Sequence, residues 1–244
     1  MKVRAVILDL YKTLLEVGPP PADAEERWEF LWEDMLADAA RLTLSEFAEG
    51  CEKIIAEEHS LARGLGIKNP EIYWPAVARR VLPELERLQE TELDTFLLRH
   101  AQLQRTIRLM PGAAEALLEL RARKLFLGII SNSQPYTVRE LDLALGETGL
   151  DRCLFHPELC FWSYQAGFSK PNPHVFRWIS TRLRMLGILP AETLMIGDRL
   201  DNDILPAKAQ EWKTWQLLPE RGGPNQSDQG TWFNFREALV SGKI

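Results

Sequence analysis

The hydrophobic residues of this chain fall into a few short apolar runs, which are separated by longer segments with helical periodicity. The first run, residues 3–8, contains Arg4 as its only polar residue and predicts a buried strand. Three more runs predict strands at residues 124–131, 192–198 and, from a weaker pattern, 213–218. Strands that alternate with helices predict an α/β fold of three layers, in which helices cover both faces of a parallel sheet.

One long helical stretch interrupts this alternation. It starts with the proline-rich segment GPPPAD, residues 18–23, and predicted helices follow one another from there. Their expected bounds are 22–42, 43–66, 74–88 and 91–105. The sequence therefore predicts a sheet domain formed by residues 1–16 and 109–244, with a helical domain of residues 17–108 inserted after the first strand.

Polar side chains stand at the carboxyl ends of three predicted strands, where Asp9, Ser131 and Asp198 are found. In an open parallel sheet, ligands bind at this edge, so we expect the three side chains to belong to one site. A carboxylate such as Asp9 can attack an electrophilic centre and form a covalent ester or acyl phosphate, which water then cleaves. The end of the first strand therefore predicts a nucleophile.

Three nearby side chains suit an anionic substrate. Ser131 and Asn132 can donate hydrogen bonds to an anionic group at the strand end. Lys170 supplies a compact positive charge that can pair with a phosphate and with Asp9 at once. Together these residues predict a pocket for a small anion.

The carboxylates in the same segments suit a metal ion. Asp9 and Asp198, with a backbone carbonyl near Tyr11, offer the hard oxygen ligands that Mg²⁺ prefers. Asp203 is expected just behind them, or bound to the metal through a water molecule. A divalent cation would also offset the cost of burying several like charges together. Mg²⁺ is therefore the expected cofactor.

Four segments, in this order along the chain, resemble the motifs of the haloacid dehalogenase (HAD) superfamily of hydrolases. They are ILDLYKTLL (7–15), GIISNS (128–133), GFSKPNPHVF (167–176) and MIGDRLDNDI (195–204). The resemblance covers the predicted sheet domain, while the helical block resembles the family's cap only in its position and helical character. It implies a Rossmann-like α/β core with an inserted α-helical cap.

The resemblance also implies a role for each matching residue. Asp9 would be the nucleophile and Lys170 its catalytic partner. The residues that would hold the substrate are Tyr11, Thr13, Ser131, Asn132 and Lys170. The residues that would bind Mg²⁺ are Asp9, Tyr11, Asp198 and Asp203, with Tyr11 acting through its backbone carbonyl.

Tyr11 is the main departure from the pattern of the family's phosphatases. Those enzymes carry an aspartate two residues after the nucleophile, as the general acid and base, and such assistance is worth roughly 10²–10⁴ in rate. A phenol with a pKa near 10 is a poor base at neutral pH. The 2-haloacid dehalogenase branch carries tyrosine at this place, and a halide needs no proton on leaving. Tyr11 alone therefore favours carbon–halogen hydrolysis.

Other positions favour a phosphatase. The dehalogenases of the family work without metal and lack the glycine–aspartate pair that Gly197 and Asp198 form here. Phe176 stands where that branch tends to have tyrosine, and Lys12 replaces a glycine common in both branches. The prediction is Mg²⁺-dependent phosphoester hydrolysis of a small metabolite. The alternatives are metal-independent 2-haloacid dehalogenation and, in a different class, a noncatalytic phosphate-binding protein.

Composition and charge restrict the partners of this protein. The chain has 244 residues and a formal net charge of −6, which argues against a nucleic-acid-binding surface. No stretch approaches the roughly 20 apolar residues needed to span a bilayer, so no membrane partner is expected. Its three cysteines, Cys51, Cys153 and Cys160, show neither disulfide nor zinc spacing. We expect a cytoplasmic monomer or homodimer whose partner is a small anionic metabolite.

Overall fold

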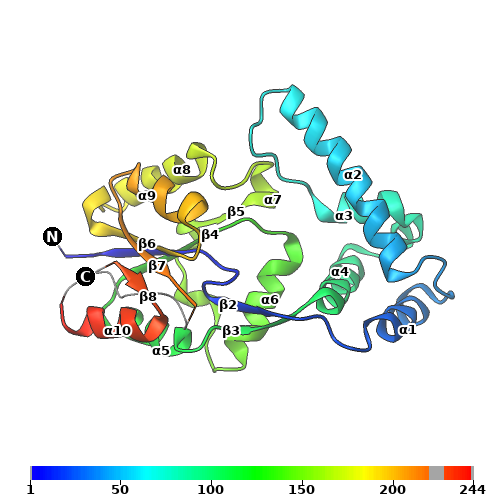
Figure 1. Cartoon of the computed structure of the whole chain (residues 1–244), viewed down its shortest axis with the longest axis horizontal. Helices are drawn as coiled ribbons and strands as arrows, with labels where there is room; N and C mark the ends of the chain where they lie inside the picture. The colour runs from blue at the N-terminus through cyan, green and yellow to red at the C-terminus, as the bar shows by residue number, and fades with distance from the viewer. Residues whose placement is uncertain (1, 220–227, 243–244) are drawn as a thin grey trace.

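A six-stranded sheet forms the centre of the computed structural model, which describes residues 2–219 and 228–242 (Figure 1). The strand order is β5-β4-β1-β6-β7-β8, and all the pairs are parallel. The strands are β1 (Ala5–Leu8), β4 (Phe126–Ser131), β5 (Cys160–Trp162), β6 (Thr193–Gly197), β7 (Lys213–Leu217) and β8 (Gln229–Gly230). The predicted parallel α/β fold is confirmed. The sequence did not predict β5 and β8, which have three and two residues.

Helices cover both faces of the sheet, as Figure 1 shows. The helices outside the long insertion are α5 (Ala113–Ala122), α6 (Pro135–Gly146), α7 (Ser163–Ala166), α8 (Pro173–Met185), α9 (Leu205–Lys208) and α10 (Trp232–Val240). The buried side chains of α5, α6 and α10 pack in one cluster with Val6 and Leu8 of β1. Those of α8 and α9 pack in another cluster with Ala5 and Ile7. Alternate residues of β1 thus belong to opposite layers, because successive strand side chains point to opposite faces.

Four helices form the helical insertion, residues 24–104. They are α1 (Ala24–Leu36), α2 (Leu44–Gly64), α3 (Trp74–Val81) and α4 (Glu90–Gln104). They share a hydrophobic core of their own, which includes the fully buried rings of Trp28, Trp32, Phe47 and Phe96. The helix predicted for 74–88 is wrong beyond Val81, because Pro83 disfavours helical backbone at the preceding residue, and a 3₁₀ turn, η1 (Pro83–Arg87), follows. No helix in the described part of the chain is long and apolar enough to cross a membrane.

A small antiparallel sheet of two strands connects the insertion to the main sheet (Figure 1). Its strands are β2 (Leu15–Gly18) and β3 (Thr106–Leu109), which the sequence did not predict as strands. Gly18 faces Thr106 in this pair of strands. A Cβ on Gly18 would lie 2.2 Å from Thr106 Oγ1, so a side chain at position 18 would make the Thr106 hydroxyl turn away.

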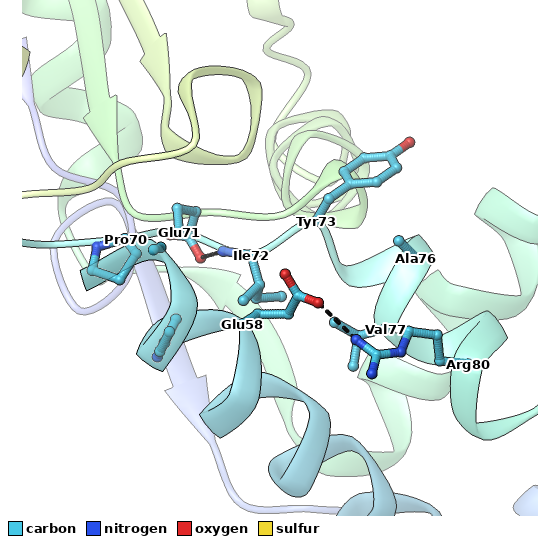
Figure 2. A pocket seen from close by; sticks show the side chains of 10 residues that line it. Glu58, Pro70, Glu71, Ile72, Tyr73, Ala76, Val77 and Arg80 are labelled. Atoms are coloured by element: carbon cyan, nitrogen blue, oxygen red, sulfur yellow. Dashed lines mark hydrogen bonds and ion pairs between the residues drawn. The ribbon is translucent and has the colours of Figure 1, made fainter. Parts of the chain in front are cut away.

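The insertion also contacts the sheet side of the molecule through the segment between α2 and α3. Pro70 forms an antiparallel bridge with Phe168. The carboxylate of Glu71 accepts hydrogen bonds from Ser163 Oγ at 2.7 Å and Gln134 Nε2 at 3.0 Å. Glu71 also lines a cavity of about 210 Å³ within the insertion; Figure 2 shows its side chain among those that line this cavity. The insertion is therefore held to the rest of the molecule through the β2–β3 strand pair, through this segment and through α4, whose Thr95 accepts a hydrogen bond from Arg139 of α6.

Candidate active site

The structure brings Asp9, Asp198 and Asp203 to one edge of the sheet. Asp9 follows β1 and Asp198 follows β6, and these two strands are neighbours. The backbone N–H of Asp9 donates to the carbonyl of Ile196 at 2.9 Å, which fixes the end of β1 against β6. Asp203 lies in a π-helical turn, η5 (Leu200–Ile204), directly after β6. The shared edge is the one at which parallel sheets bind ligands.

Gly197 allows the turn that carries Asp203 to fold back onto β6. A Cβ at position 197 would lie 2.5 Å from Asp203 Cβ and 2.5 Å from Asp203 Oδ2. Real Cβ atoms do not tolerate such contacts, so any side chain at 197 would displace the Asp203 carboxylate. The glycine of the last motif therefore has a steric reason in this chain.

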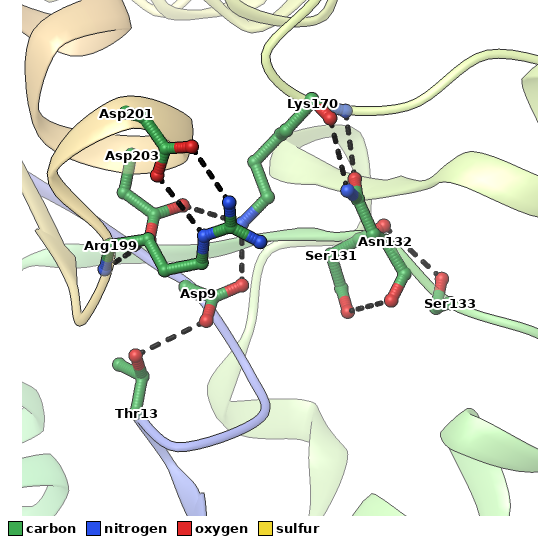
Figure 3. A network of polar contacts seen from close by, with 9 residues as sticks. All are labelled: Asp9, Thr13, Ser131, Asn132, Ser133, Lys170, Arg199, Asp201 and Asp203. Carbon is green, nitrogen blue, oxygen red and sulfur yellow. Dashed lines mark hydrogen bonds and ion pairs between the residues drawn. The ribbon is translucent and has the colours of Figure 1, made fainter. Parts of the chain in front are cut away.

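One lysine ties two of the three carboxylates together (Figure 3). Lys170 Nζ lies 2.5 Å from Asp9 Oδ1 and 2.6 Å from Asp203 Oδ1. The lysine is 4% exposed and Asp203 is 1% exposed, so both ion pairs are buried. Asp9 Oδ2 accepts a hydrogen bond from Thr13 Oγ1 at 3.2 Å, and Asp203 Oδ2 accepts one from the N–H of Arg199 at 3.1 Å.

Burial and the neighbouring charges shift the pKa values of the ionisable groups in this cluster. It raises the pKa of Asp203, a shift that Lys170 opposes and Asp9 reinforces. It also raises the pKa of Asp198, with the Asp203 charge adding to the effect. Burial alone would lower the pKa of Lys170, but the carboxylates of Asp9 and Asp203 outweigh it and raise that pKa. Lys170 is therefore held as an ammonium ion.

The three carboxylates form a group that could hold a metal ion. One ligand oxygen from each of Asp9, Asp198 and Asp203 lies within 4.8 Å of the others. The buried ammonium group of Lys170 pairs with Asp9 and Asp203, so the three carboxylates carry more negative charge than this buried cation offsets. Carboxylate oxygens in this arrangement fit a hard divalent cation such as Mg²⁺.

Asn132 is used to position Lys170. Its Oδ1 accepts from the backbone N–H of Lys170 at 2.7 Å, and its Nδ2 donates to the backbone carbonyl of Lys170 at 3.1 Å. The hydroxyl of Ser131, which ends β4, makes only a long contact of 3.4 Å with the carbonyl of Asn132 (Figure 3). The amide side chain thus clamps the segment that presents the lysine to Asp9.

A cavity of about 440 Å³ opens beside the cluster. Its lining residues are Asp9, Tyr11, Lys12, Asn132, Lys170, Asp198, Arg199, Asn202 and Asp203. Thr13 and Ser131 are buried next to this cavity and are not among the residues that line it, within the described chain. The cavity lies at the edge of the sheet where the site was predicted, and its lining combines these acidic residues with the cations Lys12, Lys170 and Arg199.

Two cations in this lining were missed by the sequence analysis as site residues. Lys12 is exposed and has a φ of 60°, a left-handed conformation that favours glycine. Its charge helps to lower the pKa of Asp198 against the effect of burial. Arg199 pairs with Asp201, with Nη2 2.7 Å from Oδ2. The signal for Lys12 was present in the sequence, as a lysine at a place where glycine is common.

Tyr11 lies beside the nucleophile candidate, but its hydroxyl is hydrogen-bonded to residues outside the carboxylate cluster. The hydroxyl donates to Glu140 Oε2, lies 2.9 Å from Thr137 Oγ1 and accepts from Arg105 Nη2 at 3.0 Å. Arg105 also pairs with Glu140, with Nη2 3.0 Å from Oε2. Burial raises the pKa of the Tyr11 phenol above its ordinary value, and the Glu140 charge adds to this. A phenol in this state is a poor proton donor and a poor base.

The comparisons with known proteins agree with these motifs. A family model described as haloacid dehalogenase-like hydrolase matches residues 3–210. A glyceraldehyde 3-phosphate phosphatase from Pyrococcus furiosus is 33% identical over 108 residues, which are 44% of this chain and 41% of that protein. The chain spans half or less of the length of the curated relatives that it matches.

Solved structures share the fold along nearly the whole chain. A 2-haloacid dehalogenase from Pseudomonas syringae pv. Tomato superposes with a TM-score of 0.62 at 20% identity, over 98% of this chain and 99% of that one. A HAD-family enzyme from Bacteroides thetaiotaomicron, in complex with magnesium and inorganic phosphate, gives a TM-score of 0.53 at 18% identity, over 91% and 96%. The family model covers most of the sequence, and the chain belongs to the haloacid dehalogenase-like hydrolases.

Proposed function

We propose that this protein is a Mg²⁺-dependent phosphoester hydrolase that acts on a small anionic metabolite, with Asp9 as its nucleophile. The observation that carries the proposal is the convergence of Asp9, Asp198 and Asp203, whose oxygens lie within 4.8 Å of one another. The phosphatase name of the Pyrococcus furiosus relative supports the same reaction class.

The metal would be held by the carboxylates of Asp9 and Asp198, with the backbone carbonyl of Tyr11. Asp203 Oδ1 is already bound by Lys170, so Asp203 would act from behind them or through a water molecule. When bound, Mg²⁺ would polarise the phosphoryl oxygens and screen them from the Asp9 carboxylate. The excess negative charge of the cluster is the physical reason for a cation here.

The chain's own residues can carry out a two-step displacement. An oxygen of Asp9 attacks phosphorus, the bond from phosphorus to the ester oxygen breaks, and the alkoxide or phenoxide leaves with the electron pair. Water then attacks the aspartyl phosphate, which releases inorganic phosphate and restores the carboxylate. Thr13 and Lys170 each hold one oxygen of Asp9, and Lys170 also balances charge on the transferred group. Asn132 keeps Lys170 in place through its backbone.

Tyr11 limits the substrates that suit this site. Its hydroxyl is bound by Glu140 and Arg105, and burial makes it a poor acid, so it does not supply the proton that an alkoxide needs. Esters whose leaving groups are stable as anions are therefore the favoured substrates.

We further propose that residues 17–108 act as a cap over a core formed by residues 1–16 and 109–244. The insertion has its own buried core and contacts the sheet side through the β2–β3 strand pair, the Glu71 segment and Arg105. Closure of such a cap would exclude water from the attack on phosphorus and would help to select the substrate.

Metal-independent hydrolysis of 2-halo acids is the second candidate. Tyr11 favours it, because the dehalogenase branch of the family has tyrosine at this place and halide leaves without a proton. Asp9 would then attack carbon, and the carbon–halogen bond would break. The three clustered carboxylates favour the metal-dependent reaction instead.

Turnover with and without Mg²⁺, with EDTA in the metal-free arm, separates these functions. The substrates are 4-nitrophenyl phosphate and 2-chloropropionate, and the variants are Asp9→Asn and Asp142→Asn, a half-buried acid on α6 that pairs with Arg152. We expect phosphate release that needs Mg²⁺, is abolished by Asp9→Asn and is retained in Asp142→Asn. Halide release in EDTA would establish the second candidate. Phosphate binding without turnover of either substrate would show a noncatalytic protein.

A further inference from the structure

A third cavity lies at the junction of the helical insertion and the sheet domain. It has a volume of about 200 Å³ and is lined by residues of α2, α4 and the beginnings of α3 and α6, together with Arg105. Its walls include Cys51, Ile55, Trp74, His100, Arg105 and Tyr136. Among the described residues, it shares none of its lining with the cavity beside Asp9.

His100 lines this cavity as a buried histidine whose ring is not hydrogen-bonded. It is 4% exposed, and neither of its ring nitrogens has a hydrogen-bond partner among the described residues. Its ring stacks on Trp74, with centroids 5.8 Å apart, and the Trp74 indole N–H is also buried without a partner. Each buried polar atom left unpaired costs roughly 1–3 kcal/mol. A ligand in the cavity that hydrogen-bonds to these three atoms would remove this cost.

The buried groups around the cavity are uncharged or already paired, and the one further carboxylate in the lining, Glu52, is exposed to solvent. Burial lowers the pKa of His100 to about 4, so at neutral pH its ring offers one donor and one acceptor. Burial raises the pKa of Cys51 to about 12, which keeps the thiol protonated. Arg105 is neutralised by Glu140, whose side chain is 2% exposed. A neutral ligand that donates and accepts hydrogen bonds is therefore the best match.

Arg105 places this cavity next to the active site. It lines the cavity with His100, and its guanidinium carbon lies 4.8 Å from the ring centroid of Tyr11. Tyr11 in turn lines the cavity that contains Asp9. The Arg105–Tyr11 contact thus forms the wall between the two cavities.

We propose that the cavity beside His100 binds an uncharged organic group of the alcohol or primary-amide class, through the His100 ring and the Trp74 indole N–H. Two sources share this chemistry, the organic half of the substrate and a separate small molecule. The first source rests on the proposed phosphoester hydrolysis, whereas the second is independent of it.

Propionamide and propionate form a matched pair of probes, because they share shape and differ in charge. Their binding to the full chain is read from the imidazole signals in long-range ¹H–¹⁵N spectra, which resolve His100 from the other three histidines. We expect propionamide to shift the His100 signals in a saturable way, and propionate to bind at least tenfold more weakly. No shift with propionamide, or an equal shift with propionate, would overturn the proposal.

Two variants test the assignment to these side chains. Trp74→Phe keeps an aromatic ring but removes the N–H, and should weaken propionamide binding several-fold. His100→Phe should abolish the binding seen by the Trp74 indole signal. His174→Gln, an exposed control on α8, should bind as the wild type does. Unchanged affinity in both cavity variants would place the ligand elsewhere.

Turnover distinguishes the two sources. Competitive inhibition of 4-nitrophenyl phosphate hydrolysis by propionamide would identify the cavity with the organic half of the substrate. Saturable binding without competition would identify a separate ligand. Because binding is measured without turnover, a failed phosphatase assay leaves the test of this cavity intact.

Discussion

The guanidinium of Arg105 covers the ring of Tyr11, 4.8 Å from its centroid, and donates to the Tyr11 hydroxyl at 3.0 Å. Arg105 directly follows α4, the last helix of the insertion, while Tyr11 is two residues from Asp9. The contact therefore joins the exit of the insertion to the segment that carries the proposed nucleophile.

Arg105→Met should destabilise the protein strongly. The Glu140 carboxylate is buried, and removal of its cation leaves an uncompensated charge, which costs about 3–5 kcal/mol in such pairs. The double variant Arg105→Met/Glu140→Gln should recover much of the loss. Arg108→Met, which breaks the exposed pair with Glu16, is the control and should have a much smaller effect. Urea unfolding measures all three, and equal losses for Arg105 and Arg108 would contradict the buried-pair account.

The rate should depend steeply on the leaving group. Without a proton from Tyr11, kcat/KM for a nitrophenyl phosphate should exceed that for an alkyl phosphate by at least about 10²-fold. Tyr11→Phe should leave the slope of log(kcat/KM) against leaving-group pKa as it is, because the hydroxyl does not serve as the acid. Tyr11→Asp should make the slope shallower. A shallow slope in the wild type that steepens in Tyr11→Phe would show that the phenol does act as the acid.

Removal of Asp203 should weaken Mg²⁺ binding about 10- to 100-fold, since it supports the proposed metal ligands. Isothermal titration calorimetry with Mg²⁺ compares Asp203→Asn and Asp198→Asn with the wild type. Asp201→Asn is the matched control, because Asp201 belongs to the same segment but is exposed and pairs with Arg199. A loss of affinity in Asp201→Asn as large as in Asp203→Asn would argue against the proposed metal group.

Lys12 and Lys124 provide a matched pair for the anion site. Both are exposed lysines in the left-handed conformation, with φ of 60° and 59°, but only Lys12 lines the cavity beside Asp9. Substitution of either by glycine should relieve similar backbone strain. Only Lys12→Gly should raise KM for 4-nitrophenyl phosphate, by about two- to fivefold, the effect of losing one exposed cation. A rise of the same size in Lys124→Gly would remove Lys12 from the site.

His100 should make the protein sensitive to acid. Its pKa is lowered from 6.5 to about 4 by burial, with Arg105 adding to the shift, so the unfolded chain takes up a proton at higher pH than the folded one. The stability due to neutral His100 is therefore present above pH 6.5 and is lost as the pH falls toward 4. His100→Phe should lose less stability over this range, by up to roughly 3 kcal/mol. Parallel pH profiles of urea unfolding for the two proteins would contradict this.

The parts of the fold that local patterns encode were predictable from the sequence. The strands β1, β4 and β6 are apolar runs that end in polar residues, so the meeting of Asp9 and Asp198 at one edge followed from the parallel order. The end of α3 was also encoded, in Pro83, although the predicted helix ran past it. β5 and β8 are too short to show alternation.

Contacts between distant side chains were not predictable in this way. Arg105 and Glu140 are 35 residues apart, and no pattern pairs the end of α4, which Arg105 follows, with α6, which carries Glu140. Asn132 was assigned to the substrate from its position, but a residue type does not reveal that its amide faces the backbone of Lys170. Tyr11 is a similar case, because the sequence shows that a tyrosine follows Asp9 but does not show that its hydroxyl points to Glu140.

The pair of strands β2 and β3, which leads into the insertion, has a consequence for the engineering of this protein. Gly18 and Thr106 are paired, so the chain leaves and re-enters the sheet side at a single point. The sheet pairs β1 with β4 directly, although the whole helical block lies between them in the sequence. A cap taken from another enzyme could therefore be grafted between these two residues. Such a graft has to supply its own partner for the buried Glu140 carboxylate, because Arg105 lies within the exchanged segment.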